Sequence, residues 1–168
     1  QFYDNDDFLE AFKENIIKFD LESYDKVIFS YHGLPMSQLD ATYSKGRCND
    51  RNCTNGVSGD NHHCYRATCY ETTKLLLDKL NIDNEKTITA FQSRLSSNWV
   101  EPFSDKVIEE FAEDGAKNIL VMMKKLLRWM MRCDMISNDE KKKENKKIIK
   151  SLRDYHTAFF SREVQIKF

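Results

Sequence analysis

Apolar residues in the first part of the chain occur in two patterns, at helical spacing and in short runs. These two patterns predict helices and strands in turn. Phe8, Phe12 and Ile16 recur at helical spacing within residues 4–19, so this segment predicts an amphipathic helix. Residues 26–31, with the sequence KVIFSY, form a short apolar run with β-branched residues, which is typical of a buried strand. The chain therefore opens with a helix followed by a strand.

The same pattern continues to about residue 122. It predicts a helix over 68–80, a strand over 87–91, a helix from Pro102 to Gly115, and a strand over 118–122. Parallel strands need crossover connections, and helices between successive strands supply them. We therefore expect an α/β fold with a parallel sheet and crossover helices.

The predicted strand ends carry the first candidate chemistry. His32 lies one residue beyond the first strand, and Gln92 and Ser93 follow the second. Because ligands of open parallel sheets bind beyond the carboxyl ends of the strands, we expect these side chains to meet in one cleft. The imidazole of His32 can bind a divalent metal or accept a proton near neutral pH, although a histidine in such a place is also often an ordinary loop residue.

A long polar stretch, residues 36–64, shows no periodicity. Loops of this length in a compact domain are usually functional or are organised by something other than packing. Cys48, Cys53, Cys64 and Cys69 follow one another with the spacing C-x4-C-x10-C-x4-C. Four thiolates in so short a span can close around one Zn²⁺ or an iron–sulfur cluster, and four buried reduced thiols are the alternative.

The charge of the chain divides it into two segments. Residues 122–168 hold 13 Lys/Arg and 6 Asp/Glu, whereas residues 1–121 hold 13 and 21, and the net charge of the whole chain is only -1. We therefore expect a domain over 1–121 and a divergent basic tail over 122–168, and we expect no nucleic acid as a partner. Five cysteines without a visible secretory signal favour metal or redox chemistry over structural disulfides, and we expect a cytoplasmic protein.

The basic tail has the pattern of an amphipathic helix. Lys124, Arg128 and Arg132 share one helical face, opposite a face of Met and Leu residues. Such a helix either covers the sheet or lies on an anionic membrane surface, which would give the protein a peripheral membrane contact.

Several motifs, taken together and in order, resemble a known family. The residues that carry the resemblance are Ser30-Tyr31-His32-Gly33-Leu34-Pro35, Cys64-Tyr65-Arg66-Ala67-Thr68-Cys69, Thr72-Thr73, Phe91-Gln92-Ser93-Arg94, Trp99 and Pro102. They are similar to the C-terminal half of ferrochelatase, in its bacterial variant with internal cysteines, and the similarity ends near residue 121. The resemblance implies a Rossmann-like chelatase half-domain and a lyase that inserts Fe²⁺ into protoporphyrin IX, the last step of haem biosynthesis.

The resemblance also implies roles for single residues. His32 matches the family histidine assigned to metal binding or to proton abstraction from the pyrrole nitrogens. Substrate-binding positions are implied for Ser30, Tyr31, Gln92, Ser93 and Trp99. The four cysteines Cys48, Cys53, Cys64 and Cys69 are implied to hold a two-iron two-sulfur cluster, with Zn²⁺ as the alternative.

Two departures from the family limit the expected activity. No residue after Val121 matches the glutamate that faces the histidine across the porphyrin in the family. The half that precedes this one in the family is expected on the same polypeptide or on another chain. The chain is therefore expected to be either an incomplete form of the enzyme or a non-catalytic iron–sulfur or zinc binding module on a chelatase fold.

Overall fold

The computed structural model describes residues 3–124 and 164–167. Its centre is a four-stranded sheet with the strand order β2-β1-β3-β4. The strands are β1 (Lys26–His32), β2 (Thr87–Gln92), β3 (Asn118–Lys124) and β4 (Val164–Lys167). The first three are parallel, and β4 pairs antiparallel with β3. The predicted α/β fold with a parallel sheet is confirmed.

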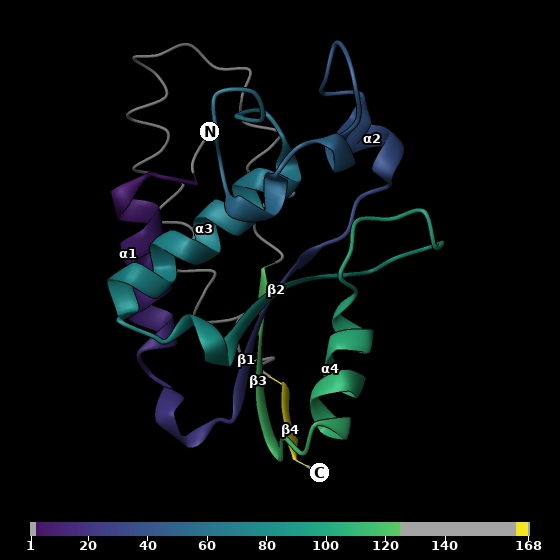
Figure 1. Cartoon of the computed structure of the whole chain (residues 1–168). Coiled ribbons are helices and arrows are strands. Elements are labelled where there is room, and N and C mark those ends of the chain that lie inside the picture. Colours follow the sequence, from purple (N-terminus) through teal and green to yellow (C-terminus); the bar gives the residue numbers. More distant parts are fainter. Residues whose placement is uncertain (1–2, 125–163, 168) are drawn as a thin grey trace.

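Helices cover both faces of this sheet (Figure 1). The helices are α1 (Asp6–Ile16), α2 (Met36–Asp40), α3 (Tyr65–Leu80) and α4 (Ser104–Glu113), with short 3₁₀ turns η1 (Leu21–Ser23), η2 (Cys48–Asp50), η3 (Cys53–Asn55) and η4 (Asn84–Lys86). Helices α1 and α3 lie on one face and pack against each other, and α4 lies on the other face. This three-layer arrangement is the one that crossover helices impose on a parallel sheet.

The two sides of the core follow the alternation of side chains along the strands. Val27, Phe29 and Tyr31 of β1 belong to the larger core beneath α1 and α3. Ile28 of β1 belongs instead to a smaller core with Val107 of α4. Successive strand residues point to opposite faces, so one apolar run fills both layers. This explains why the run over β1 is continuously apolar.

Several predicted boundaries differ from those in the structure. Strand β2 ends at Gln92, so this residue does not lie beyond the strand as predicted. His32 is the last residue of β1 and does not lie beyond it. Helix α4 begins at Ser104, so Pro102 is not its first residue. The carbonyl of Pro102 instead accepts a hydrogen bond from the Phe91 amide at 2.8 Å, which ties this segment to β2.

The polar stretch after β1 is folded locally around its cysteines. It contains α2 and the turns η2 and η3, and the sulfur-bearing residues Cys48 and Cys53 are fully buried. Helix α3 begins at Tyr65, three residues before the predicted start. The cysteines of this stretch belong to the larger core, so the stretch is packed in part, and the prediction that it is functional stays a prediction.

The tail prediction is only partly covered by the structure. Residues 122–124 continue β3, so Lys124, which was predicted to lie on the polar face of the tail helix, belongs to this strand instead. The rest of that helix falls on residues 125–163, which lie outside the described residues, and the boundary between 1–121 and 122–168 stays a prediction. Among the described residues, no helix has the length and apolar content needed to span a membrane.

Candidate functional site

His32 and Gln92 lie side by side at the carboxyl ends of β1 and β2. They are partners in the parallel register, and the amide of Gly33 donates to the Gln92 carbonyl at 2.7 Å. Both residues are half-buried, and the Tyr65 hydroxyl donates to the His32 carbonyl at 2.8 Å. The structure thus brings the two predicted motifs together at one edge of the sheet.

Trp99 packs beside the same end of β1 and β2. It pairs with Pro35 in an antiparallel bridge, and the amide of Val100 donates to the Leu34 carbonyl at 3.0 Å. A Cβ atom at Gly33 would meet the Trp99 ring atom Cε3 at 3.2 Å and the Gln92 carbonyl oxygen at 2.8 Å. Gly33 is therefore required for the close approach of these segments.

Ser93 begins an exposed loop that leaves this edge. Its backbone is in the left-handed region, with φ of 65°. Arg94 anchors the loop to α4 through Asp105 at 2.8 Å and lies over the Phe103 ring at 4.3 Å. Leu95 follows with 87% of its surface exposed, which makes it one of the most exposed large apolar side chains among the described residues. The loop presents Ser93 and Leu95 to solvent beside His32 and Gln92.

Ser30 and Tyr31 lie inside the core, although they precede His32 directly. The Ser30 hydroxyl shares a 2.8 Å hydrogen bond with Ser104, and the Tyr31 hydroxyl shares one of 2.8 Å with Thr73. Both residues are buried, and burial raises the pKa of Tyr31 well above its ordinary value. The structure gives both hydroxyls partners between the sheet and its helices, and their predicted role in substrate binding stays a prediction.

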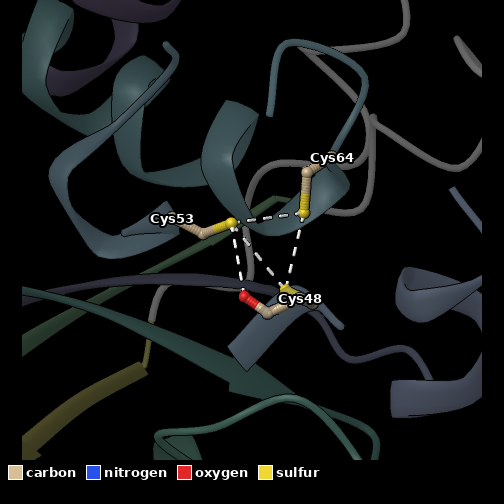
Figure 2. Close-up of side chains that lie close together, drawn as sticks. All are labelled: Cys48, Cys53 and Cys64. Atoms are coloured by element: carbon tan, nitrogen blue, oxygen red, sulfur yellow. Dashed lines mark hydrogen bonds between the residues drawn. The ribbon is translucent and has the colours of Figure 1, made fainter. Parts of the chain in front are cut away.

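Three of the four predicted cysteines come together in a second site. The sulfur atoms of Cys48, Cys53 and Cys64, here called the thiol group, point toward one another (Figure 2). Their Sγ–Sγ distances are 3.8 Å for Cys48–Cys53, 3.6 Å for Cys48–Cys64 and 3.7 Å for Cys53–Cys64. All three residues are buried, and this group could bind a metal ion.

Cys69 is not part of the thiol group. It is buried in α3, where its neighbours include Tyr65 and Tyr31 of β1. The reason is helical geometry: Cys64 directly precedes α3, whereas Cys69 lies more than one turn inside it, on the side of the sheet. The neighbouring His62 and His63 are exposed and are not in the group either.

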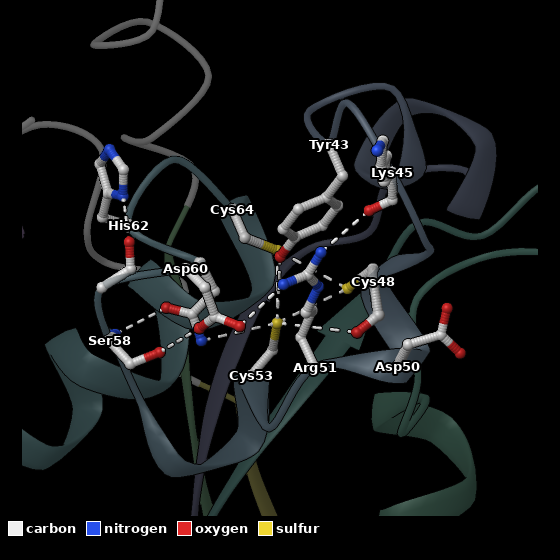
Figure 3. Close-up of polar contacts among 12 residues, drawn as sticks. Tyr43, Lys45, Cys48, Asp50, Arg51, Cys53, Ser58, Asp60, His62 and Cys64 are labelled. Carbon is white, nitrogen blue, oxygen red and sulfur yellow. Dashed lines mark hydrogen bonds and ion pairs between the residues drawn. The ribbon is translucent and has the colours of Figure 1, made fainter.

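Polar residues that the sequence did not single out surround the thiol group (Figure 3). The Tyr43 hydroxyl lies 3.4 Å from Cys53 Sγ, and the buried amide of Asn61 donates to the same sulfur at 3.9 Å. The guanidinium of Arg51 lies 4.9 Å from the centre of the Tyr43 ring and pairs with Asp60 at 2.7 Å. No periodicity marks such residues, and only their position within the cysteine segment could have drawn attention to them.

Burial and the hydrogen bonds between the sulfurs shift the pKa values of the three thiols in different directions. The pKa of Cys64 is lowered to about 5, first by a hydrogen bond from Cys48 and further by the Tyr43 hydroxyl and the Ala67 amide. The pKa of Cys48 is raised, because it donates to Cys64 and is buried. Burial, followed by the nearby Cys64 charge, also raises the pKa of Cys53. A thiolate at the start of α3 is the form that binds metal ions.

Comparisons with known proteins identify the family of this chain. The family model of ferrochelatase matches residues 1–124. The ferrochelatase of Coxiella burnetii (strain Dugway 5J108-111) is 40% identical over 100 residues, which are 58% of this chain and 28% of that protein. The ferrochelatase of Pseudomonas fluorescens (strain Pf0-1) is 34% identical over 125 residues, or 72% of this chain and 37% of that protein.

A third relative gives the same coverage. The ferrochelatase of Legionella pneumophila (strain Corby) is 35% identical over 121 residues, or 71% of this chain and 36% of that protein. The chain thus spans about a third of the length of these curated relatives. Since the family model covers most of the chain and includes His32, Gln92 and the thiol group, this chain belongs to the ferrochelatase family.

Proposed function

We propose that this chain supplies the C-terminal part of a ferrochelatase, which inserts Fe²⁺ into protoporphyrin IX to form haem. The observation that carries the proposal is the pairing of His32 with Gln92 at the carboxyl ends of two parallel strands, with Trp99 packed beside them. Ligands of open parallel sheets bind at this edge.

The chemistry of metal insertion suits an imidazole at this position. Two pyrrole N–H protons must leave the macrocycle as the metal enters, and the His32 side chain can accept a proton or ligate the incoming Fe²⁺. The Trp99 ring offers an aromatic surface to a flat macrocycle, and the Gln92 amide and Ser93 hydroxyl offer polar groups to its substituents. The exposed Leu95 adds an apolar contact beside them.

The test compares two histidine variants of the full chain. Binding of protoporphyrin IX is followed by fluorescence, and metallation with Fe²⁺ or Zn²⁺ by absorbance. We expect His32→Ala to slow metallation by about 100-fold or more, the range in which a positioned base contributes, and to leave porphyrin binding largely intact. His62→Ala is the matched control, because His62 is exposed in the cysteine segment.

Two results would count against this proposal. If His32→Ala metallates porphyrin at the wild-type rate, His32 has no part in the reaction. If the full chain neither binds nor metallates porphyrin, while the thiol group still holds metal, the chain is the non-catalytic binding module.

We also propose that the thiol group holds a metal centre, either an iron–sulfur cluster or Zn²⁺. Three buried thiols in mutual contact favour this second function, because clustered cysteine thiolates are the ligands that hold Zn²⁺ and iron–sulfur centres in proteins. The described cysteines are all free thiols, which agrees with a cytoplasmic location. We further propose that the basic tail, residues 122–168, gives the protein a peripheral membrane contact.

A further inference from the structure

The three sulfur–sulfur distances of the thiol group carry information about what it binds. All three lie between 3.6 and 3.8 Å, so the sulfurs form a nearly equilateral triangle. Figure 2 shows the three side chains converging on this triangle from separate segments, two of them in the 3₁₀ turns η2 and η3 and the third directly before α3. Each sulfur is thus placed by a different piece of backbone.

A triangle of this size fits one tetrahedral metal ion. Two thiolate sulfurs bound to Zn²⁺ at about 2.3 Å with tetrahedral angles lie about 3.8 Å apart. The three measured distances depart from this value by at most 0.2 Å. Three of the four corners of a tetrahedral coordination shell are therefore already in place.

A two-iron two-sulfur cluster does not fit the same triangle. Such a cluster takes two cysteines on each iron, so at least one of three ligating sulfurs must belong to the second iron. That sulfur would lie across the cluster from the other two, and two of the three distances would be long. All three are short, and Cys69, the remaining cysteine of the motif, faces the sheet.

The fourth corner has a candidate donor in Tyr43. Its hydroxyl lies 3.4 Å from Cys53 Sγ. Oxygen and sulfur ligands at about 2.1 and 2.3 Å from one tetrahedral ion lie about 3.6 Å apart. The Tyr43 oxygen is therefore at a suitable distance to complete the shell (Figure 3).

The surroundings also suit a centre that carries excess negative charge. Three thiolates around a divalent ion leave one net negative charge, and the Arg51 guanidinium, which also pairs with Asp60, lies over the Tyr43 ring at 4.9 Å. Asn61, which is only 2% exposed, donates to Cys53 Sγ. Such donors orient the ligands and stabilise thiolate charge in metal sites.

We propose that Cys48, Cys53 and Cys64 bind a single tetrahedral divalent ion of the Zn²⁺ or Fe²⁺ class, with the Tyr43 oxygen as fourth ligand. The proposal rests on the metal-binding function proposed above and narrows it to one ion without inorganic sulfide. Each of the three thiols loses its proton to solvent as the ion binds, whereas Tyr43 keeps its hydroxyl proton and binds through an oxygen lone pair, so the centre carries one net negative charge and no oxidation or reduction takes place.

The test uses the full chain, stripped of metal with a chelator and titrated with Co²⁺. Tetrahedral Co²⁺ with thiolate ligands gives intense visible and sulfur-to-metal charge-transfer bands. We expect saturation at one Co²⁺ per chain, displacement by Zn²⁺, and no acid-labile sulfide after reconstitution with Fe²⁺ and sulfide. Because these measurements use the wild-type chain, they do not depend on whether a variant folds.

Variants then identify the ligands. Cys48→Ser, Cys53→Ser or Cys64→Ser is expected to abolish the charge-transfer bands, whereas Cys69→Ser, the matched control, is expected to keep them. Tyr43→Phe retains the ring beneath Arg51 and is expected to change the Co²⁺ spectrum and to weaken binding by about 10- to 100-fold. An unchanged spectrum and affinity in Tyr43→Phe would overturn the assignment of the fourth ligand.

Two other outcomes separate this inference from the broader proposal. Two irons and two sulfides per chain, lost also in Cys69→Ser, would overturn the single-ion site and leave the metal-binding function standing. A chain that retains no Co²⁺, Zn²⁺ or iron would overturn both.

Discussion

Gly33 offers a test of how the strand-end site is assembled, because its surroundings leave no room for a side chain. In Gly33→Ala the new Cβ would lie 2.8 Å from the Gln92 carbonyl oxygen and 3.2 Å from Trp99 Cε3. The first atom belongs to the backbone and cannot turn away as a flexible side chain could. That same oxygen accepts the 2.7 Å hydrogen bond from the Gly33 amide, so relieving the clash weakens this bond.

The cost follows from overpacking at one point. Adding a methyl group to a tightly packed site costs about 1–3 kcal/mol, and a weakened backbone hydrogen bond lies within that range. We therefore expect the free energy of unfolding of Gly33→Ala to fall by about 2 kcal/mol, measured by urea denaturation of the full chain. Metallation of porphyrin should fall with it, because the clash separates His32 from Gln92.

Gly59→Ala is the matched control for this experiment. A Cβ at Gly59 meets no atom within 4 Å, so its unfolding midpoint should remain close to that of the wild type. If Gly33→Ala and Gly59→Ala unfold at the same urea concentration, the close approach of β1, β2 and Trp99 does not contribute to stability as argued here.

Two further predictions concern stability away from the site. Thr73→Val removes the hydroxyl that bonds to the buried hydroxyls of both Tyr31 and Thr89. We expect the free energy of unfolding, measured by urea denaturation, to fall by about 1–3 kcal/mol, and to fall less in Thr73→Ser, which keeps a hydroxyl. Equal losses in the two variants would contradict the role of the Thr73 hydroxyl. The pKa of Asp25 is lowered, because its carboxylate accepts hydrogen bonds from two backbone amides at the start of β3. A lowered folded-state pKa gives stability that is present above the ordinary Asp pKa of about 4 and is lost as the pH falls through the folded-state value, so urea midpoints of Asp25→Asn should depend less on acid pH than those of the wild type.

The sheet could be predicted because its strands are short apolar runs. The central parts of β1, β2 and β3 are buried, and apolar residues are concentrated there between polar connections. The residues at which the strands end are less clearly indicated by the sequence. His32 was placed beyond β1, but the parallel register with Gln92 extends the ladder to include it, and no local pattern announces such pairing.

The composition predicted a site formed by cysteines, but it did not predict which of the four cysteines belong to that site. Four cysteines in a polar segment indicate a site held together by sulfur, and three of them meet. The exclusion of Cys69 depends on where α3 begins, and the sequence alone placed that start three residues too late. Tyr43 was not predicted to be a site residue, because no pattern in an aperiodic loop relates a tyrosine to the neighbouring cysteines.

One residue pair joins the two sites. Cys64 belongs to the thiol group, and the next residue, Tyr65, donates its hydroxyl to the carbonyl of His32 at 2.8 Å. Burial raises the pKa of Tyr65, so this hydroxyl keeps its proton and remains a donor throughout the neutral range. Whatever fixes Cys64 therefore also fixes the first turn of α3 and, through it, the backbone at the end of β1. A metal ion in the thiol group would act in this way, because it would hold three otherwise separate segments of the polar stretch against the start of the helix that positions His32.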